Sequence, residues 1–253
     1  PQLDHDIGLA TAAELLGTGA TWNFAPVLAV PQDIRWGRTY EAYSDDPEVV
    51  TELSVAFLEG LQSVDVVPQV VGTPKHFVAD GAAEWSTSEH PDGWLIDQGD
   101  ASISEDELRA VHLAPYEAAV DAGARTIMGS FSSWHGEKVH GREDVMTGML
   151  REDLGFDGFL VSDWAAIDQI DPDYRTAVVA AVNAGVDMNM VPQDAQRWLS
   201  TLRSAVEDGD VSEARIDEAV RRILTVKFET GLFEQPFAHR EWLDRVGSDE
   251  HRS

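Results

Sequence analysis

The chain has 253 residues, and its content of 43% hydrophobic, 8% aromatic and 25% charged residues is typical of a folded domain with a sizeable core, not of a disordered chain. Its 46 acidic and 18 basic residues give a formal net charge of −28, which argues against a nucleic-acid partner, and the absence of cysteine excludes disulfides and thiolate chemistry. The sequence has no apolar run long enough to cross a membrane and no signal-peptide layout at its start, so we expect no membrane partner.

Short apolar runs alternate with segments whose apolar residues recur at helical spacing, which is the pattern of βα units around a parallel sheet. In chain order we expect a helix at 3–17, a strand at 20–24, a helix at 50–61, a strand at 72–78, a helix at 104–123, strands at 126–131 and 158–161, a helix at 174–184, a strand at 186–190 and helices at 194–207 and 212–228. A capping box supports the start of the third helix, because Glu107 follows Ser104 by three residues.

These elements predict one α/β domain of the (β/α)8 TIM-barrel type over residues 1–253, with no linker and no repeat. About five or six strands fit the sequence, whereas a closed barrel has eight. Many of the remaining residues fall in long loops at 25–47, 79–103 and 132–144. We therefore expect an incomplete barrel that exposes strand edges and apolar helix faces, and that is prone to association or instability.

The distribution of charge suggests adaptation to high salt. Acidic residues are scattered along the whole chain, and arginines greatly outnumber the three lysines, Lys75, Lys138 and Lys227. Repulsion among the carboxylates is screened when the Debye length falls to about 3 Å in 1 M salt, and it strains the fold in dilute buffer. We therefore expect a halophilic protein that loses structure when salt is removed. The alternative is an ordinary acidic protein whose stability does not depend on salt.

Polar side chains stand where several apolar runs end, and in a barrel of parallel strands these ends form the mouth of the active site. The polar residues at these ends are Lys75, His76, Ser130, Ser132, Ser133, Asp163, Trp164, Asp187 and Asn189. The loop 35–41 adds two arginines, two aromatic residues and a carboxylate. Such a set suits a polyhydroxylated ligand, because charged groups bond hydroxyls and an indole covers the apolar face of a sugar ring. Taken singly, each residue also has a structural explanation, such as a helix cap, a solvated lysine or core packing.

Several motifs are recognisable at these positions. In chain order they are 24–26 (FAP), 35–41 (RWGRTYE), 75–81 (KHFVADG), 129–134 (GSFSSW), 159–164 (FLVSDW), 184–188 (AGVDM), 226–228 (VKF) and 231–233 (GLF). Together they resemble glycoside hydrolase family 3, and most closely its β-glucosidases and exo-acting β-glucan glucohydrolases. The resemblance extends almost from end to end. It implies a barrel-type catalytic domain that hydrolyses terminal β-D-glucosidic bonds of glucosides or β-glucan oligosaccharides and uses no cofactor or metal.

The resemblance also implies a role for individual residues. Asp163 matches the nucleophile of a retaining two-step reaction, in which it attacks the anomeric carbon and water then opens the glycosyl-enzyme. Lys75 and Arg38 match residues that bond sugar hydroxyls, and their positive charge would help to keep the nucleophile ionised. His76 matches another residue of the innermost sugar site, and Trp164 matches one wall of an aromatic clamp around the next sugar.

Three further residues near these motifs, Arg35, Glu41 and Phe131, have other expected roles. Arg35 is expected to form a structural ion pair, and Glu41 either orients Arg38 at the substrate site or faces solvent. Phe131 stands where the family commonly has a tyrosine whose hydroxyl lies near the nucleophile. We therefore expect that hydrogen bond to be missing.

The ends of the chain also depart from the family pattern. The chain starts after the first barrel strands, which carry an aspartate that binds the innermost sugar. Residues 247–253 correspond to the approach to a second α/β domain, which supplies the acid/base glutamate and the other clamp tryptophan. We expect that domain to be absent here, and the isolated chain to be weak or inactive on unactivated glucosides, because general acid catalysis contributes about 10² to 10⁴ in rate.

Two alternatives remain open. The β-N-acetylglucosaminidases of the same family take a catalytic histidine from the loop after the Lys-His-Phe strand. Here Ser86, Thr87 and Ser88 occupy the positions of that motif, and His90 lies two positions late. The other alternative is a non-catalytic fragment that binds sugar. The family resemblance also suggests a periplasmic or extracellular location.

Overall fold

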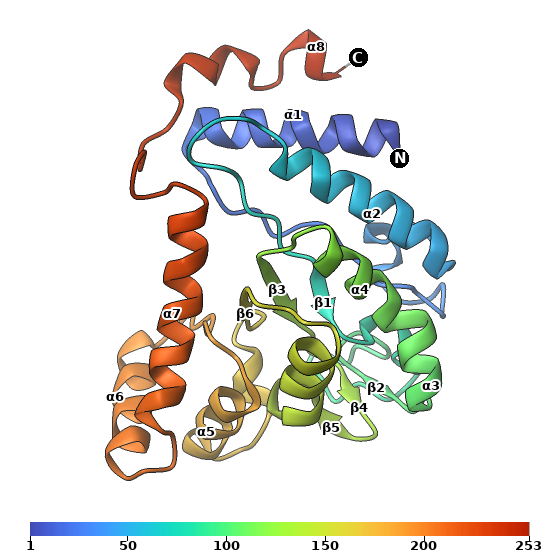
Figure 1. Ribbon diagram of the computed structural model, residues 1–253. Coiled ribbons are helices and arrows are strands. Elements are labelled where there is room, and N and C mark those ends of the chain that lie inside the picture. Colours follow the sequence, from blue (N-terminus) through green and yellow to red (C-terminus); the bar gives the residue numbers. More distant parts are fainter. Residues whose placement is uncertain (253) are drawn as a thin grey trace.

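The centre of the computed structural model, which describes residues 1–252, is a sheet of three short parallel strands (Figure 1). In spatial order these are β1 (Lys75–Phe77), β3 (Thr126–Gly129) and β6 (Phe159–Val161). A helical segment connects each strand to the next, which is the kind of crossover that parallel neighbours require.

The sheet is extended on both sides by segments that form isolated bridges, one of which joins Val27 to Lys75 of β1. Trp22 pairs with Val71 on one side, and Met188 pairs with Val161 on the other, both in parallel. The five strand segments expected from the sequence therefore lie next to one another in chain order, although two of them contribute isolated bridges only. The domain has a TIM-barrel-like α/β fold, and its barrel is incomplete, as the sequence predicts.

Helices surround the sheet. The longer ones are α1 (Gln2–Thr18), α2 (Pro47–Gln62), α4 (Ala114–Asp121), η5 (Asp144–Asp153), α5 (Tyr174–Ala184), α6 (Ala195–Glu207) and α7 (Glu213–Glu229). Shorter turns of helix are η1 (Thr39–Glu41), η2 (Asp80–Ala82), α3 (Glu105–Glu107), η3 (Leu108–Leu113), η4 (Val139–Gly141), η6 (Ala166–Gln169), η7 (Arg240–Arg245) and α8 (Asp249–Arg252). None of the helices within residues 1–252 combines the length and apolar character that crossing a bilayer requires.

The helical stretch α3–η3–α4 begins where the sequence predicts. The Ser104 side chain accepts a hydrogen bond from the Glu107 backbone N–H, which confirms the N-cap. The middle of the stretch is a π-helix. Pro115, the second residue of α4, has no N–H to donate to the preceding turn, which explains why the regular α-helical ladder is interrupted there. The helix η5 has no counterpart in the sequence prediction, because Thr147 and Gly148, two poor helix formers, interrupt its short apolar pattern.

A second small sheet occupies part of the expected loops. It contains β2 (Asp100–Ala101), β4 (Ser133–Trp134) and β5 (Glu137–Lys138); β2 and β4 are parallel and β4 and β5 antiparallel. The hairpin between β4 and β5 turns at His135 and Gly136, whose φ angles are 54° and 83°. Two successive positive φ angles are the geometry of a two-residue type I′ turn.

Alternate residues of the central strands face two different cores. Ile127 and Leu160 belong to the larger core, which packs against the outer helices. Met128 and Val161 belong to a smaller core on the opposite face, together with Val226 of α7. Because both faces of the sheet are covered, β6 is apolar throughout, as the continuous run at 158–161 predicts.

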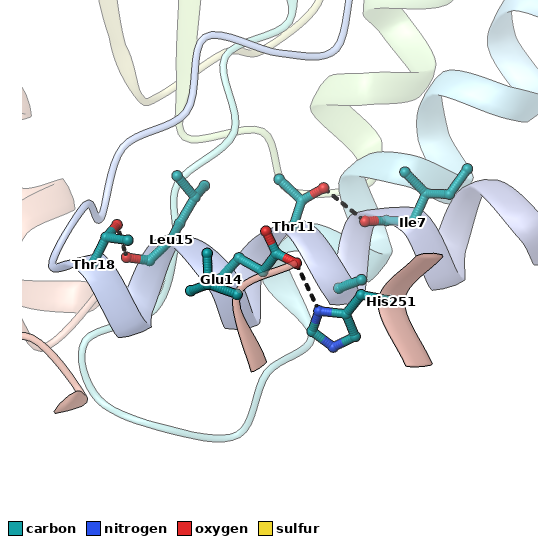
Figure 2. A pocket seen from close by; sticks show the side chains of 8 residues that line it. Ile7, Thr11, Glu14, Leu15, Thr18 and His251 are labelled. Atoms are coloured by element: carbon teal, nitrogen blue, oxygen red, sulfur yellow. Dashed lines mark hydrogen bonds and ion pairs between the residues drawn. The ribbon is translucent and has the colours of Figure 1, made fainter. Parts of the chain in front are cut away.

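The C-terminal segment returns to α1, so that both ends of the chain lie on the same side of the domain (Figure 1). The Nδ1 atom of His251 lies 2.9 Å from Oε1 of Glu14, an oxygen that also accepts the backbone N–H of Gly247 (Figure 2). These hydrogen bonds, first that of Gly247 and then that of His251, lower the pKa of Glu14. The shallow pocket between α1 and α8 is lined in part by Ile7, Leu15 and Val246, and it shares no residue with the site described next.

Candidate active site

The residues that the sequence singles out come from three segments that are far apart in the chain. Glu41 ends the turn η1 and Arg38 directly precedes it; Lys75 and His76 belong to β1, and Asp163 and Trp164 follow β6. Since β1, β3 and β6 are neighbours in one parallel sheet, these segments meet at the same region of the molecule.

Four side chains form a continuous hydrogen-bonded chain. The Arg38 guanidinium donates two bonds to the carboxylate of Glu41, at 2.8 and 2.9 Å, and its Nη2 lies 3.0 Å from Nε2 of His76. Because arginine can only donate, Nε2 of His76 is an acceptor and the ring proton is on Nδ1. That nitrogen donates to Oδ2 of Asp80 at 2.9 Å. The chain therefore fixes the tautomer and the orientation of the buried imidazole.

The Asp163 carboxylate lies beside this chain. Its Oδ2 is 3.6 Å from Nε2 of His76, and its Oδ1 accepts the Trp164 backbone N–H at 2.6 Å. The side chain is 13% exposed, so the carboxylate is mostly enclosed but still reachable from outside. One oxygen is thus held by the backbone, while the other is close to the imidazole without sharing a proton with it.

Two positive charges lie near the carboxylates of the site. Burial lowers the pKa of Lys75, and the positive charge of Arg38 lowers it further. The negative groups that oppose this shift are Glu41, Asp163 and Asp80. Burial alone would lower the pKa of Arg38, but the paired hydrogen bonds to Glu41 raise it above its ordinary value. The same bonds lower the pKa of Glu41, so this pair stays charged and Glu41 orients Arg38 instead of facing solvent.

The rim of the site carries aromatic groups. The Trp164 side chain is largely exposed, at 61%, which leaves it free to cover a ligand. Arg35 forms an ion pair with Asp33, and its guanidinium lies 4.1 Å from the centre of the Trp85 ring. Arg35 therefore forms a structural ion pair, as the sequence predicts.

The expectation that Asp187 faces the mouth is wrong. Its side chain is fully buried and is surrounded by three guanidiniums, those of Arg151 (2.5 Å), Arg215 (2.8 Å) and Arg222 (3.1 Å). Its Oδ2 also accepts the backbone N–H of Leu160 at 2.9 Å. Asp187 is buried because its backbone pairs with Leu160, in the middle of β6, and not with the end of that strand. Its side chain is directed at the arginines of η5 and α7.

Two residues near Asp163 were not singled out by the sequence. Asp80 holds His76, and it stands within the motif 75–81, so the motif itself was a signal for it. His140 accepts the backbone N–H of Asp163 through Nε2 at 3.2 Å. His140 lies in a segment without strand or helix periodicity, and no sequence pattern points to it. The ring of Phe131, which has no hydroxyl, lies 6.5 Å from the His140 ring.

The histidine of the N-acetylglucosaminidase alternative is engaged within its own loop. The His90 ring stacks on Trp94 with 3.6 Å between ring centres, and its Nδ1 accepts the backbone N–H of Asp92 at 3.2 Å. Within residues 1–252, no group of three or more histidine, aspartate and glutamate side chains is arranged to hold a metal ion.

A polar groove of about 960 Å³ opens beside η6, the turn that follows Trp164. Hydroxyl, amide and carboxylate groups line it, including Glu89, Gln98 and Asp168. Gln169 bridges the groove walls, because its Nε2 donates to Oε1 of Gln98 at 2.7 Å. This arrangement joins the loop after β1 to the loop after β6.

Comparison with known sequences identifies close similarities. The sequence profile of the Glycosyl hydrolase family 3 N terminal domain matches residues 1–226. A β-xylosidase of Formosa agariphila is 34% identical over 100% of this chain and 36% of its own length. A lysosomal β-glucosidase of Dictyostelium discoideum is 34% identical over 96% of this chain and 30% of its own length.

Solved structures of a β-glucanase and a β-glucosidase are also similar to this chain. The exo-1,3/1,4-β-glucanase ExoP of a Pseudoalteromonas species superimposes with a TM-score of 0.89 and 37% identity, over 99% of this chain and 32% of that one. The β-glucosidase of Listeria innocua, solved in complex with glucose, superimposes with a TM-score of 0.88 and 29% identity, over 99% of this chain and 34% of that one. The chain thus spans about a third of the length of the proteins that it matches.

Proposed function

The chain belongs to glycosyl hydrolase family 3, and from that membership we propose that it carries the sugar site and the nucleophile of a retaining β-glucosidase-type hydrolase. One observation carries the proposal: the Asp163 carboxylate lies 3.6 Å from His76 in a cluster that includes Arg38 and Lys75. The names of the similar proteins, which include β-glucosidases and an exo-β-glucanase, support glucosides as substrates.

The proposed reaction has two displacements at the anomeric carbon. In the first, an oxygen of Asp163 forms a bond to that carbon while the bond to the leaving oxygen breaks. In the second, water attacks the same carbon, the bond to Asp163 breaks, and the carboxylate is regenerated with release of a proton. Two inversions give a product with the original β configuration.

The neighbouring residues would bind and orient the glucosyl group. Lys75 and Arg38 present positive donors to the sugar hydroxyls, and Arg38 is already aligned by its two bonds to Glu41. His76, whose ring is held by Arg38 at Nε2 and by Asp80 at Nδ1, would shape the innermost sugar site next to Asp163. The exposed indole of Trp164 would cover the apolar face of the ring at the next position.

Protonation of the leaving group is the step that these residues do not supply. The family resemblance assigns the acid/base glutamate to a part of the longer enzymes that the match does not cover. We therefore expect this chain alone to release an activated phenol and to be slow on cellobiose or laminari-oligosaccharides, since a missing general acid lowers the rate by about 10² to 10⁴.

The experiment is a stopped-flow measurement of 4-nitrophenol release from 4-nitrophenyl β-D-glucoside. We expect a first-turnover burst from the chain, loss of the burst in Asp163→Asn, and an unchanged burst in the control Asp157→Asn, an exposed aspartate that precedes β6. Glucose binding without any burst would instead support a non-catalytic sugar-binding fragment. Preference for the N-acetylglucosaminide with loss of activity in His90→Ala would support the N-acetylglucosaminidase alternative.

A further inference from the structure

His140 connects the ends of two neighbouring strands. It lies in η4, and its side chain is buried, with 1% of the residue exposed. Its Nε2 accepts the backbone N–H of Asp163 at 3.2 Å, so the ring proton is on Nδ1. The ring also hydrogen-bonds to the backbone of Ser130, where only the carbonyl can accept. The imidazole therefore links the residue after β3 to the second residue after β6.

This link stands where the backbone ladder has ended. β3 and β6 pair as far as Met128 and Val161, and beyond these residues the backbone N–H groups bond to other neighbours. The N–H of Asp163 finds its acceptor in a side chain and not in the sheet. A backbone N–H without any acceptor is costly in a buried position, so the ring both satisfies this group and fixes its direction.

The surroundings keep the imidazole in place and neutral. A Cβ atom on Gly129 would lie 2.7 Å from Nε2 of His140, so only glycine leaves room for the ring at the end of β3. Burial is the main cause that lowers the pKa of His140 to about 3; the hydrogen bond to Ser130 opposes it, and the positive charge of Lys138 and the ring of His76 act with it. The ring therefore stays neutral and remains an acceptor near neutral pH.

We propose that His140 is a positioning residue, which holds the backbone of Asp163 so that its carboxylate enters the sugar site in one fixed direction. The catalytic consequence rests on the function proposed above. A nucleophile must reach the anomeric carbon within about 3 to 3.5 Å and in line with the leaving group, and a shift of about 1 Å lowers the rate by roughly 10²-fold. His140 is buried and would not touch the sugar.

The test compares His140→Phe, which keeps a ring but has no acceptor, with His140→Gln, whose amide oxygen can accept the Asp163 N–H. The first measurement is the rate at which 2,4-dinitrophenyl 2-deoxy-2-fluoro-β-glucoside traps the chain covalently, with glucose affinity measured by calorimetry alongside. The second is hydrogen exchange at the Asp163 amide. His112→Phe is the matched control, because His112 is also buried (3% exposed) but lies in η3, on a helix that does not hold the Asp163 backbone.

We expect His140→Phe to slow trapping and to speed exchange by at least about tenfold each, with glucose affinity kept within about threefold. His140→Gln should recover most of both effects, and His112→Phe should show neither. A folded His140→Phe variant with unchanged trapping and exchange overturns the proposal.

If His140→Phe does not fold, Gly129→Ala, whose Cβ displaces the ring, takes its place, and unchanged trapping and exchange in that variant overturn the proposal equally. If the wild-type chain is not trapped at all, the proposed function fails, and exchange at the Asp163 amide still decides whether His140 holds the backbone.

Discussion

Replacing Asp187 by asparagine probes the buried charge cluster that joins η5 and α7 to the sheet. The carboxylate accepts from the guanidiniums of Arg151, Arg215 and Arg222 and from one backbone N–H, and none of its side chain is exposed. The asparagine would keep the volume and one acceptor oxygen, but it would remove the negative charge and turn an amide donor toward arginine.

The expected loss of unfolding free energy follows from the three arginines that would stay buried without their carboxylate partner. Removing one partner of a buried ion pair costs about 3 to 5 kcal/mol, because the opposite charge stays buried without compensation. Burial already lowers the pKa of Arg151 to about 10, and Asp187 is the main group that opposes this shift. For a chain of this size each kcal/mol lowers the melting temperature by about 2 to 4 °C, so we expect a loss of roughly 6 to 20 °C.

The assay is thermal unfolding followed by circular dichroism, in one buffer of high salt, for the wild type and two variants. The control is Asp208→Asn, because Asp208 pairs with Arg175 at 2.8 Å while its side chain is 62% exposed. Exposed ion pairs contribute little, so this variant should melt close to the wild type. A melting temperature of Asp187→Asn as high as that of Asp208→Asn would refute the reasoning.

Three further predictions concern salt, acid and the rim of the site. The net charge of −28 predicts a melting temperature that rises steeply between dilute buffer and 1 M salt; an unchanged value would point to an ordinary acidic protein. Burial lowers the pKa of His112 to about 4, so the unfolded chain gains a proton below about pH 6.5 that the folded chain excludes. The free energy of unfolding should therefore fall as the pH drops from 7 to 5, by up to about 1.4 kcal/mol per pH unit for this histidine. Denaturant titrations at several pH values should show that this free energy depends less on pH in His112→Gln than in the wild type. Trp164→Ala should leave the melting temperature nearly unchanged, since the side chain is 61% exposed, and should weaken binding of an aryl glucoside in calorimetry; equal affinity would exclude Trp164 from the ligand site.

The sequence predicted the parallel segments well because their signals are local. The continuous apolar run at 159–161, the capping residue Ser104 and the helix at 174–184 all appear in the structure where the pattern places them. The small sheet was missed because each of its strands has only two residues, which is too short for an alternating pattern. The helix η5 was missed because Gly148 interrupts it.

In the candidate site, too, the sequence predicted residues that lie in local motifs and missed contacts between distant parts of the chain. Motif recognition singled out Asp163, His76 and Arg38, and the structure brings these three side chains together. The partners that hold them depend on the fold. His140 meets Asp163 across 23 positions of the chain, and no spacing rule connects two such residues. Asp187 was misplaced for the same reason, because its burial depends on arginines of other elements.

The most direct measurement is mass spectrometry of the chain after incubation with 2,4-dinitrophenyl 2-deoxy-2-fluoro-β-glucoside, followed by proteolysis and peptide mapping. If Asp163 is the nucleophile, one fluoroglucosyl group is attached to the peptide that contains it, and Asp163→Asn remains unlabelled. Labelling of a different carboxylate, or no labelling of a folded chain that binds glucose, would contradict the proposed role of Asp163.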